Sequence, residues 1–205
     1  MRTDTQTSTA ADALDAEMAA RLFTQARTHA RFDARPVPQA LLRRLYELAS
    51  LGPTSMNCQS ARFVFVASAA ARERLLPHVS EGNRPKVLSA PVTVIVARDT
   101  RFHEWMPTLW HMPGAREDFE RRPSHAQATA VRNATLAGGY LLMAARALGL
   151  ACGPMSGFDA QGVDRSFFPD GRWQSDFLLN LGYAAGDAAR PRGPRLGFEQ
   201  ACVLA

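Results

Sequence analysis

The chain has 205 residues, of which 46% are hydrophobic and 21% are charged, as in ordinary globular proteins. No segment approaches about 18 uninterrupted apolar residues, so we expect no membrane-spanning helix. Residues 1–15 lack a basic stretch followed by an apolar one, which argues against a secretory signal and predicts a flexible tail. The remainder, residues 16–205, is expected to form a single domain.

The formal net charge of +5 would permit nucleic-acid binding, but the basic residues are dispersed along the chain. Nucleic-acid binding usually needs arginines and lysines on one face or helix. A groove for one phosphorylated small molecule accounts equally well for a few arginines. We therefore expect no nucleic-acid partner and treat a basic nucleic-acid-binding module as the least favoured alternative. Small basic groups occur at Arg27 and Arg31, at Arg121 and Arg122, and at Arg190, Arg192 and Arg195.

Three cysteines, Cys58, Cys152 and Cys202, lie far apart and form no Cys-x-x-Cys pair. This spacing predicts neither a disulfide framework nor a cysteine zinc site, and it fits a reducing, cytoplasmic setting. The five histidines do not cluster, so no metal site is expected. Cys58 could act as a nucleophile with a distant histidine, but a lone cysteine is more often a small apolar residue.

The first elements in chain order are two helices. Leu14, Met18 and Leu22 recur at every fourth position, which predicts an amphipathic helix over residues 11–26. A second helix is expected from Pro38 to Leu51.

A polar segment, the first loop, joins this helix to the next element: Gly52-Pro53-Thr54-Ser55-Met56-Asn57-Cys58-Gln59. It gathers hydroxyls and carboxamides where backbone groups are free to bind a ligand. An ordinary helix-to-strand connection is the alternative, because Gly and Pro commonly follow a helix.

The middle of the chain alternates between strands and helices. Residues 62–67 are aromatic and β-branched and predict a strand, after which Ser68 can cap a short helix. Glu81-Gly82-Asn83 reads as a turn. The continuously apolar run 91–97 predicts a central strand buried on both faces. The weak pattern over 98–123 predicts short helices or a flexible lid.

The longest predicted helix runs over residues 125–148, with Ser124 as its cap and Gly149 at its end. It is apolar on most of its circumference, and its small residues would let another helix approach closely. We therefore expect a core helix that is also a candidate subunit contact.

The last third of the chain predicts a short strand over 150–152 and a second glycine-rich loop over 153–159. A short helix and a strand over 177–183 are expected next. Residues 198–204 are predicted to form an outer strand or to reach onto a partner. Strands separated by helices indicate a mixed α/β layer whose sheet is not fully parallel.

Common catalytic signatures are absent from the sequence: there is no phosphate-binding Gly-Lys-Ser/Thr loop, no Gly-x-Gly-x-x-Gly, no His-Glu-x-x-His and no Gly-x-Ser-x-Gly. The chain instead has arginines after its first helix, two polar loops and arginines near its C-terminus. This arrangement can hold a phosphate at one end and a polar ring system at the other. An electron-transferring cofactor would then carry the chemistry.

Five motifs in order resemble the FMN-dependent nitroreductase superfamily, and more narrowly its malonic semialdehyde reductase branch from pyrimidine catabolism. The resemblance runs from about Met18 to the C-terminus and implies an α+β, nitroreductase-like fold. That fold has a mixed, mostly antiparallel central sheet flanked by helices and a long buried core helix at a dimer interface. The motifs are Arg27-Thr28-His29, the first loop with residues 61–65, Ala90-Pro91-Val92-Thr93, residues 153–159 and residues 194–199.

The resemblance also implies a cofactor site and no catalytic side chain, because FMN N5 would carry the chemistry. Arg27 and His29 would contact the phosphate and ribityl chain. The first loop would come from the partner subunit, and the second would face the flavin's redox edge through backbone donors. Which C-terminal arginine meets the phosphate is left open. The implied cofactor-binding residues are Arg27, Thr28, His29, Pro53, Thr54, Ser55, Asn57, Pro154, Met155, Ser156, Gly157, Arg190 and Arg192.

The function implied by the resemblance is NAD(P)H-dependent, ping-pong reduction by a homodimer, with malonic semialdehyde going to 3-hydroxypropionate. Much of the superfamily has Asn-x-Gln-Pro-Trp in the first loop, whereas this chain has Asn57-Cys58-Gln59-Ser60-Ala61. The alternatives are a general nitroreductase or quinone reductase and a flavin-binding protein without turnover. The sequence leaves open NADH against NADPH, and the acceptor among semialdehydes, quinones and nitro compounds.

Overall fold

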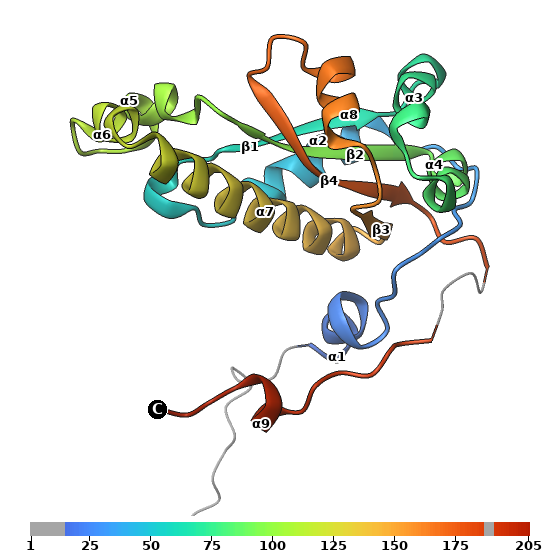
Figure 1. Cartoon of the computed structure of the whole chain (residues 1–205). Helices are drawn as coiled ribbons and strands as arrows, with labels where there is room; N and C mark the ends of the chain where they lie inside the picture. The colour runs from blue at the N-terminus through green and yellow to red at the C-terminus, as the bar shows by residue number, and fades with distance from the viewer. Residues whose placement is uncertain (1–14, 187–190) are drawn as a thin grey trace, which may run out of the picture.

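The computed structural model describes residues 15–186 and 191–205 (Figure 1). The expected tail therefore lies almost wholly outside the described residues. The helices are α1 (Ala16–Ala19) with a π-helical turn (Ala20–Thr24), α2 (Gln39–Ala49), α3 (Ala69–Leu75), α4 (Arg84–Ser89), α5 (Met106–Leu109), α6 (Ala115–Arg121), α7 (Pro123–Ala147), α8 (Ala160–Phe167) and α9 (Phe198–Ala201). The strands are β1 (Ala61–Val66), β2 (Val92–Asp99), β3 (Ala151–Met155) and β4 (Trp173–Gly182).

One four-stranded sheet forms the centre of the fold. Its order is β1-β2-β4-β3, and every neighbouring pair is antiparallel. The predicted central strand is confirmed: Val94, Ile95 and Val96 are fully buried in β2, which has a neighbour on each side. A strand without a polar face cannot meet solvent, so helices cover both faces of the sheet.

The two faces of the sheet have separate cores. On one face, α2 and α7 pack over alternate residues of β2, including Val92, Val94 and Val96. On the other face, α3, α4 and α8 pack over Ile95 and Ala97. The alternation follows from the period of two along a strand, and it gives the α+β, nitroreductase-like architecture that the resemblance implied.

The segment 98–123 is ordered as a 3-10 turn (Phe102–Trp105) followed by α5 and α6, which confirms the predicted short helices. At its start the buried carboxylate of Asp99 accepts hydrogen bonds from Arg62, at 2.6 Å, and from Arg172, at 3.1 and 3.3 Å. Because a buried carboxylate is stable only when it is paired, these bonds tie β1 and the turn before β4 to the end of β2.

Several predicted boundaries are wrong, and two of them are the start of β4, at Trp173 rather than residue 177, and the end of β3, at Met155 rather than residue 152. Helix α7 begins at Pro123 rather than after a Ser124 cap, because proline suits the first helical turn, where its missing N–H costs nothing. Residues 198–204 form no strand. Instead Gln200 accepts from the Gly197 N–H at 3.0 Å and starts α9. Helix α4 was not predicted at all, since its sequence reads as the end of a turn.

The terminal segments lie apart from the sheet. Helix α1 and the C-terminal segment that carries α9 run beside each other at one side of the body (Figure 1). The predicted first helix is shorter than expected: Asp15 caps its start and the π-helical turn ends at Thr24. Residues 11–14 of that prediction lie outside the described part of the chain.

Helix α7 buries only the side that faces the sheet. Leu141 and Ala145 are fully buried, whereas Leu136 and Tyr140 are 43% and 40% exposed. Gly138 admits the ring of Phe177 in β4, so its small size serves a strand side chain rather than a second helix. None of the described helices combines the length and the apolar character that a bilayer crossing needs.

Gly138→Ala is predicted to destabilise the protein. A Cβ there would lie 2.6 Å from Cζ of Phe177 and 3.1 Å from Cγ1 of Val96. Overpacking costs about 1–3 kcal/mol, which outweighs the roughly 1 kcal/mol that alanine gains in helix propensity. The measurement is the free energy of unfolding in urea.

Gly139→Ala is the matched control, because it changes the same residue type in the same helix and no atom lies within 4 Å of the added Cβ. It should be neutral or stabilising by up to about 1 kcal/mol. If Gly138→Ala were as stable as Gly139→Ala, the packing of Phe177 against α7 would be misassigned.

Candidate functional site

The segment Arg27–His29 runs beside β3 as an additional strand-like edge. The His29 N–H donates to the Cys152 carbonyl at 2.9 Å, and Thr28 pairs with Cys152 in the parallel sense. Gly153 is required here, because a Cβ would lie 2.6 Å from the His29 carbonyl oxygen. The contact brings the first predicted cofactor motif next to the strand that leads into the second loop.

Three arginines from distant parts of the sequence converge on the end of the first helical segment. We call Arg27, Arg146 and Arg192 the arginine cluster. Arg27 donates to the carbonyls of Thr24 and Ala26, at 3.0 and 2.9 Å. Arg192 donates to the Phe23, Thr24 and Ala26 carbonyls, at 2.5, 3.2 and 2.9 Å, and Arg146 donates to Leu22 at 3.0 Å. The partial negative charge of a helix C-terminus holds the guanidinium groups together.

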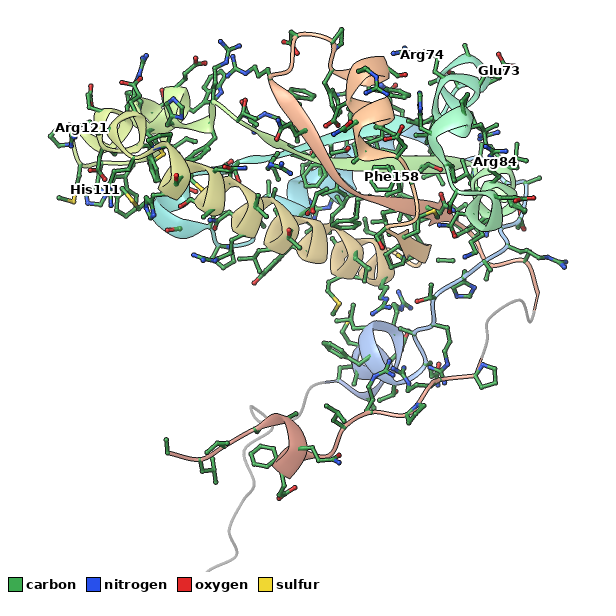
Figure 2. All side chains as sticks on the ribbon, in the orientation of Figure 1. Glu73, Arg74, Arg84, His111, Arg121 and Phe158 are labelled. Atoms are coloured by element: carbon green, nitrogen blue, oxygen red, sulfur yellow. The ribbon has the colours of Figure 1, made fainter. Side chains whose placement is uncertain are left out.

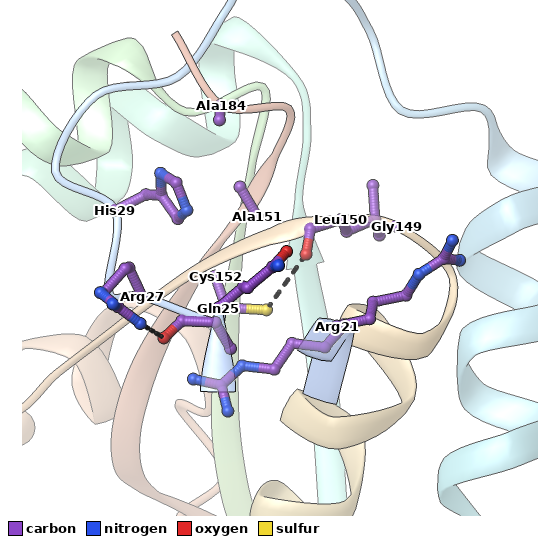
Figure 3. Close-up of a pocket in the computed structure, with 11 residues that line it drawn as sticks. Arg21, Gln25, Arg27, His29, Gly149, Leu150, Ala151, Cys152 and Ala184 are labelled. Atoms are coloured by element: carbon purple, nitrogen blue, oxygen red, sulfur yellow. Dashed lines mark hydrogen bonds between the residues drawn. The ribbon is translucent and has the colours of Figure 1, made fainter. Parts of the chain in front are cut away.

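Two adjoining cavities of about 220 and 350 Å³ open at this cluster and share Ala26, Arg27 and Arg146. Figure 3 shows the smaller one, where Arg21, Arg27 and His29 lie on different sides of Cys152. No Asp or Glu of the described chain lines either cavity. The larger is also lined by Thr28, Lys86, Arg192 and Arg195. This combination suits an anionic ligand.

Two side-chain atoms at the smaller cavity are buried without a hydrogen-bond partner in the described chain: Nδ1 of His29 and Nε of Arg146. Burial, together with the charge of Arg146, lowers the pKa of His29, so the imidazole is neutral at pH 7 and offers hydrogen bonds rather than charge. Buried polar atoms are normally paired, so both atoms indicate a ligand with polar groups.

The second loop begins inside β3, because Pro154 and Met155 belong to the strand, and only Ser156 and Gly157 follow it. Asn83 donates to the Gly157 carbonyl at 3.1 Å, and Lys86 donates to Oδ1 of Asn83 at 2.8 Å. Since Lys86 lines the larger cavity, these bonds connect the second loop to the basic cavities.

Sequence reasoning missed Asn83, Lys86 and Arg146. Asn83 looks like a turn residue, and Arg146 looks like an ordinary basic residue in the last turn of a helix. No sequence signal marked Asn83 and Lys86, because helix α4 itself was not predicted. Of the predicted residues, Arg27, Thr28, His29 and Arg192 line the cavities. Pro154, Met155, Ser156 and Gly157 line neither cavity, Met155 is buried in the core, and Gly157 is linked to the larger cavity through Asn83 and Lys86. Arg190 lies outside the described residues.

The first loop presents alternate residues to solvent and is hydrogen-bonded to α7 and to the end of α5. Pro53, Ser55 and Asn57 are exposed, whereas Thr54 is partly buried and Cys58 is buried. The Ser55 N–H donates to Oδ1 of Asn133 in α7 at 2.8 Å. Asn57 donates through Nδ2 to the carbonyl of Leu109, at the end of α5, at 3.0 Å. Three of the four predicted cofactor residues in this loop are therefore exposed, although the side chain of Asn57 is also hydrogen-bonded within its own chain, to Leu109 and Gln59.

One chain does not bring the two halves of the predicted site together. Asn133 holds the first loop and Arg146 belongs to the arginine cluster; they are 13 residues apart on α7, about 20 Å along its axis. Figure 2 shows the same separation, with His111 of the segment beside the first loop at one end of the body and Arg84 of α4 at the other.

The two buried cysteines are unsuited to nucleophilic chemistry. Burial raises the pKa of the Cys58 thiol, and it raises the pKa of Cys152 to about 12. Because the thiolate is the reactive form, neither residue is activated at neutral pH. This argues against the alternative in which Cys58 is a nucleophile.

We predict that only one of the three thiols reacts in the native protein. Iodoacetamide at pH 8 should label Cys202, which is exposed, and leave the buried Cys58 and Cys152 unmodified. All three should be labelled in urea, which is the control for reagent access. Mass spectrometry of the peptides reads the result, and rapid native labelling of Cys58 would contradict the assignment.

Comparison with known proteins agrees with this geometry. The model of the nitroreductase family matches residues 24–183. A Ralstonia nicotianae protein provisionally named NADH dehydrogenase/NAD(P)H nitroreductase is 52% identical over 89% of this chain and 93% of its own length. A Stutzerimonas stutzeri protein of the same name is 49% identical over 94% of this chain and 98% of its own length.

Solved structures share the fold at low sequence identity. A Bacillus subtilis protein provisionally described as a nitroreductase has a TM-score of 0.80 at 22% identity and covers 91% of this chain and 98% of its own. A similarly described Exiguobacterium sibiricum protein, solved in complex with FMN, has a TM-score of 0.76 at 20% identity over 92% and 96%. The family match and the relatives show that the chain belongs to the nitroreductase family, and the fold and the basic cavities agree with this assignment.

Proposed function

We propose that the protein is an FMN-dependent NAD(P)H oxidoreductase that works as a homodimer. The observation that carries the proposal is the pair of adjoining cavities, which have several arginines, no carboxylate from the described chain and two orphaned buried polar atoms. Family membership supports it, as do the FMN complex of the Exiguobacterium protein and the NAD(P)H nitroreductase names of the relatives.

The residues present fit FMN. Arg27 and Arg192 would hold the phosphate, with Thr28 and Lys86 beside it in the larger cavity. His29, neutral and with Nδ1 unpartnered, would pair with a hydroxyl of the ribityl chain. When bound, FMN would supply the redox chemistry, which is hydride transfer from NAD(P)H to the acceptor by way of the flavin N5 atom.

The second loop would orient the ring system. Backbone N–H groups of Ser156 and Gly157 donate to no acceptor in the described part of the chain, so they are available to the ring's polar edge. Lys86 and Asn83 fix the loop from behind. These groups position the cofactor, and no side chain here needs to act as a general base.

A second copy would supply the first loop. Pro53, Ser55 and Asn57 face outward, far from the arginine cluster of their own chain. Apolar side chains surround them on the same surface: Leu51 is 79% exposed, and Leu136 and Tyr140 of α7 are also exposed. Burying such a patch against a copy of itself would cover it and would place each first loop beside the other chain's cavities.

Malonic semialdehyde is the acceptor that the sequence resemblance favours. The relatives' names favour a nitro compound instead. Reoxidation rates can distinguish the two acceptors, because the same reduced protein can be mixed with either compound.

The purified protein should bind FMN, with flavin absorbance near about 450 nm, and it should bleach when mixed anaerobically with NADH or NADPH. Reoxidation rates with malonic semialdehyde and with a nitroaromatic compound should then identify the acceptor. A protein that stays colourless after incubation with FMN would overturn the proposal. A yellow protein that never bleaches would make it a flavin-binding protein without turnover.

Complementation tests the shared site. Arg27→Ala should weaken FMN binding about 30-fold, because it removes a charge-assisted phosphate contact of about 2 kcal/mol. Ser55→Tyr should block the site from the other chain, since its side chain is exposed and makes no bond in its own chain. Each variant alone should have low activity.

A dimer with one chain of each variant should recover about half of the wild-type activity, because one of its two sites is then intact. Differently tagged chains, co-expressed and purified in sequence, give this mixed dimer. If its activity stayed as low as that of the parents, both residues would belong to the same site within one chain, and the shared site would be wrong.

A further inference from the structure

A third cavity, of about 370 Å³, lies where β2 ends and α7 begins. Residues of β2, the turn after it, α6, α7 and β4 line it, and Figure 1 shows α6 and the start of α7 at the end of the body away from α4. The cavity shares no lining residue with the two basic cavities. Ala130 at this cavity and Arg146 at the basic cavities are 16 residues apart on α7, about 24 Å along its axis.

The apolar part of the lining comes from α6 and α7. Phe119, Ala126 and Ala130 are buried there in a small hydrophobic cluster, and Pro123 also lines the cavity. An apolar ligand body packed on these side chains would leave water without needing a polar partner. Sites for small molecules typically combine such a surface with a few placed polar groups.

Arg98 supplies a positive charge that the described chain does not neutralise. It faces Gln174 across β2 and β4, and its Nη2 donates to Oε1 of Gln174 at 2.7 Å. This bond fixes the guanidinium group at the cavity, and its remaining N–H groups stay available to a ligand. Although Arg98 is half-buried, it forms no ion pair within the described residues. A cation that is partly withdrawn from water is stabilised by an anion beside it.

His103 adds a second group without a partner. It lines the cavity, and its Nδ1 is buried with no hydrogen-bond partner in the described part of the chain. Glu120 also lines the cavity, but its carboxylate is paired with Nε of Arg116 at 2.7 Å. Among the described residues the cavity therefore offers one unpaired cation beside an existing negative charge. This combination favours a ligand with a single negative charge over a dianion.

We propose that this cavity binds a small monocarboxylate with an apolar body. Arg98 holds the carboxylate, because its planar guanidinium group can form two parallel hydrogen bonds to it. Phe119, Ala126 and Ala130 pack against the apolar body, and His103 pairs with a further polar group of the ligand. The site is separate from the proposed flavin site, so its test does not depend on flavin binding.

The test titrates benzoate, the probe for this class of ligand, into the full-length protein by isothermal titration calorimetry. Benzoate has one negative charge and a small aromatic body. We expect one benzoate per chain, with a dissociation constant at or below about 1 mM. Benzyl alcohol has the same ring and no charge, and it should bind about 10-fold more weakly, the value of one charge-assisted contact.

Gln174→Glu is the sharpest variant, because it keeps the shape of the side chain and the hydrogen bond from Arg98 while placing a carboxylate beside the guanidinium group. It should weaken benzoate binding about 10-fold, as should Arg98→Gln. The temperature of unfolding of Gln174→Glu should not fall, which separates lost binding from lost folding.

Arg101→Gln is the matched control, because it makes the same change of charge three residues from Arg98, at an exposed side chain that does not line the cavity. It should bind benzoate as wild type does. Arg27→Ala, which alters the basic cavities, should do so as well.

Three results would overturn the inference. The absence of saturable binding to wild type would mean that the cavity takes no monocarboxylate of this size. Equal affinity for benzoate and benzyl alcohol, or undiminished binding to Gln174→Glu, would mean that Arg98 does not hold a carboxylate. Loss of binding in Arg27→Ala, with binding retained in Arg98→Gln, would place benzoate in the basic cavities instead.

Discussion

The rigidity of α7 fixes the geometry of the candidate site. The helix has 25 residues, about 37 Å along its axis, and it packs against β2 and β4 through Gly138, Leu141 and Ala145. Its middle holds the first loop through Asn133, and its end holds the arginine cluster through Arg146. Neither half can move toward the other without unpacking the core, and this separation supports the proposal that two chains together complete the site.

A twofold arrangement of two copies follows naturally from this constraint. In an isologous contact, each chain offers its first loop to the other and receives the other's loop in return. The exposed apolar residues of α7, together with Leu51, would be buried by the same contact that builds the two sites. Stability of the dimer and completeness of the site would then depend on one surface.

The arginine cluster links three parts of the chain that otherwise touch little. Residues 22–26 come from the N-terminal segment, Arg146 from α7 and Arg192 from the C-terminal segment. The carbonyl oxygens of residues 22–26 accept hydrogen bonds from the three guanidinium groups and so hold like charges close together. This arrangement is only partly favourable, because the guanidinium groups still repel one another. An anion in the cavities would therefore strengthen the docking of both terminal segments, and the same bonds keep the cavity lined with donors before any ligand arrives.

Sequence patterns predicted the core well and the site only in pieces. The apolar run 91–97 could scarcely be anything other than a buried strand, and Gly149 marked the end of α7, where φ is +79°. The extension of β3 through Pro154 was missed, because proline is tolerated there only on an edge strand, and edge position is a tertiary property. Asn83, Lys86 and Arg146 were missed for the same reason, since their role depends on which elements approach them.

The departure of this chain from Asn-x-Gln-Pro-Trp has a structural explanation that limits its value as evidence about substrate. Ser60 stands where proline is usual; it is fully buried, and its hydroxyl donates to the Ala130 carbonyl of α7 at 3.0 Å. The bond anchors the end of a loop that holds Met56, Asn57 and Gln59 at positive φ. This conformation costs about 1–3 kcal/mol for a residue that is not glycine.

Burial of Cys58 and the hydrogen bonds that Asn133 and Thr54 accept from the loop backbone offset the same strain. A loop so held keeps Pro53, Ser55 and Asn57 in one outward geometry, with little ordering left to do when a flavin or a second chain arrives. Preorganisation of this kind favours a binding surface used across an interface. Ser60 therefore explains how the loop is kept in shape, and the choice of acceptor must be decided by residues that face the ligand.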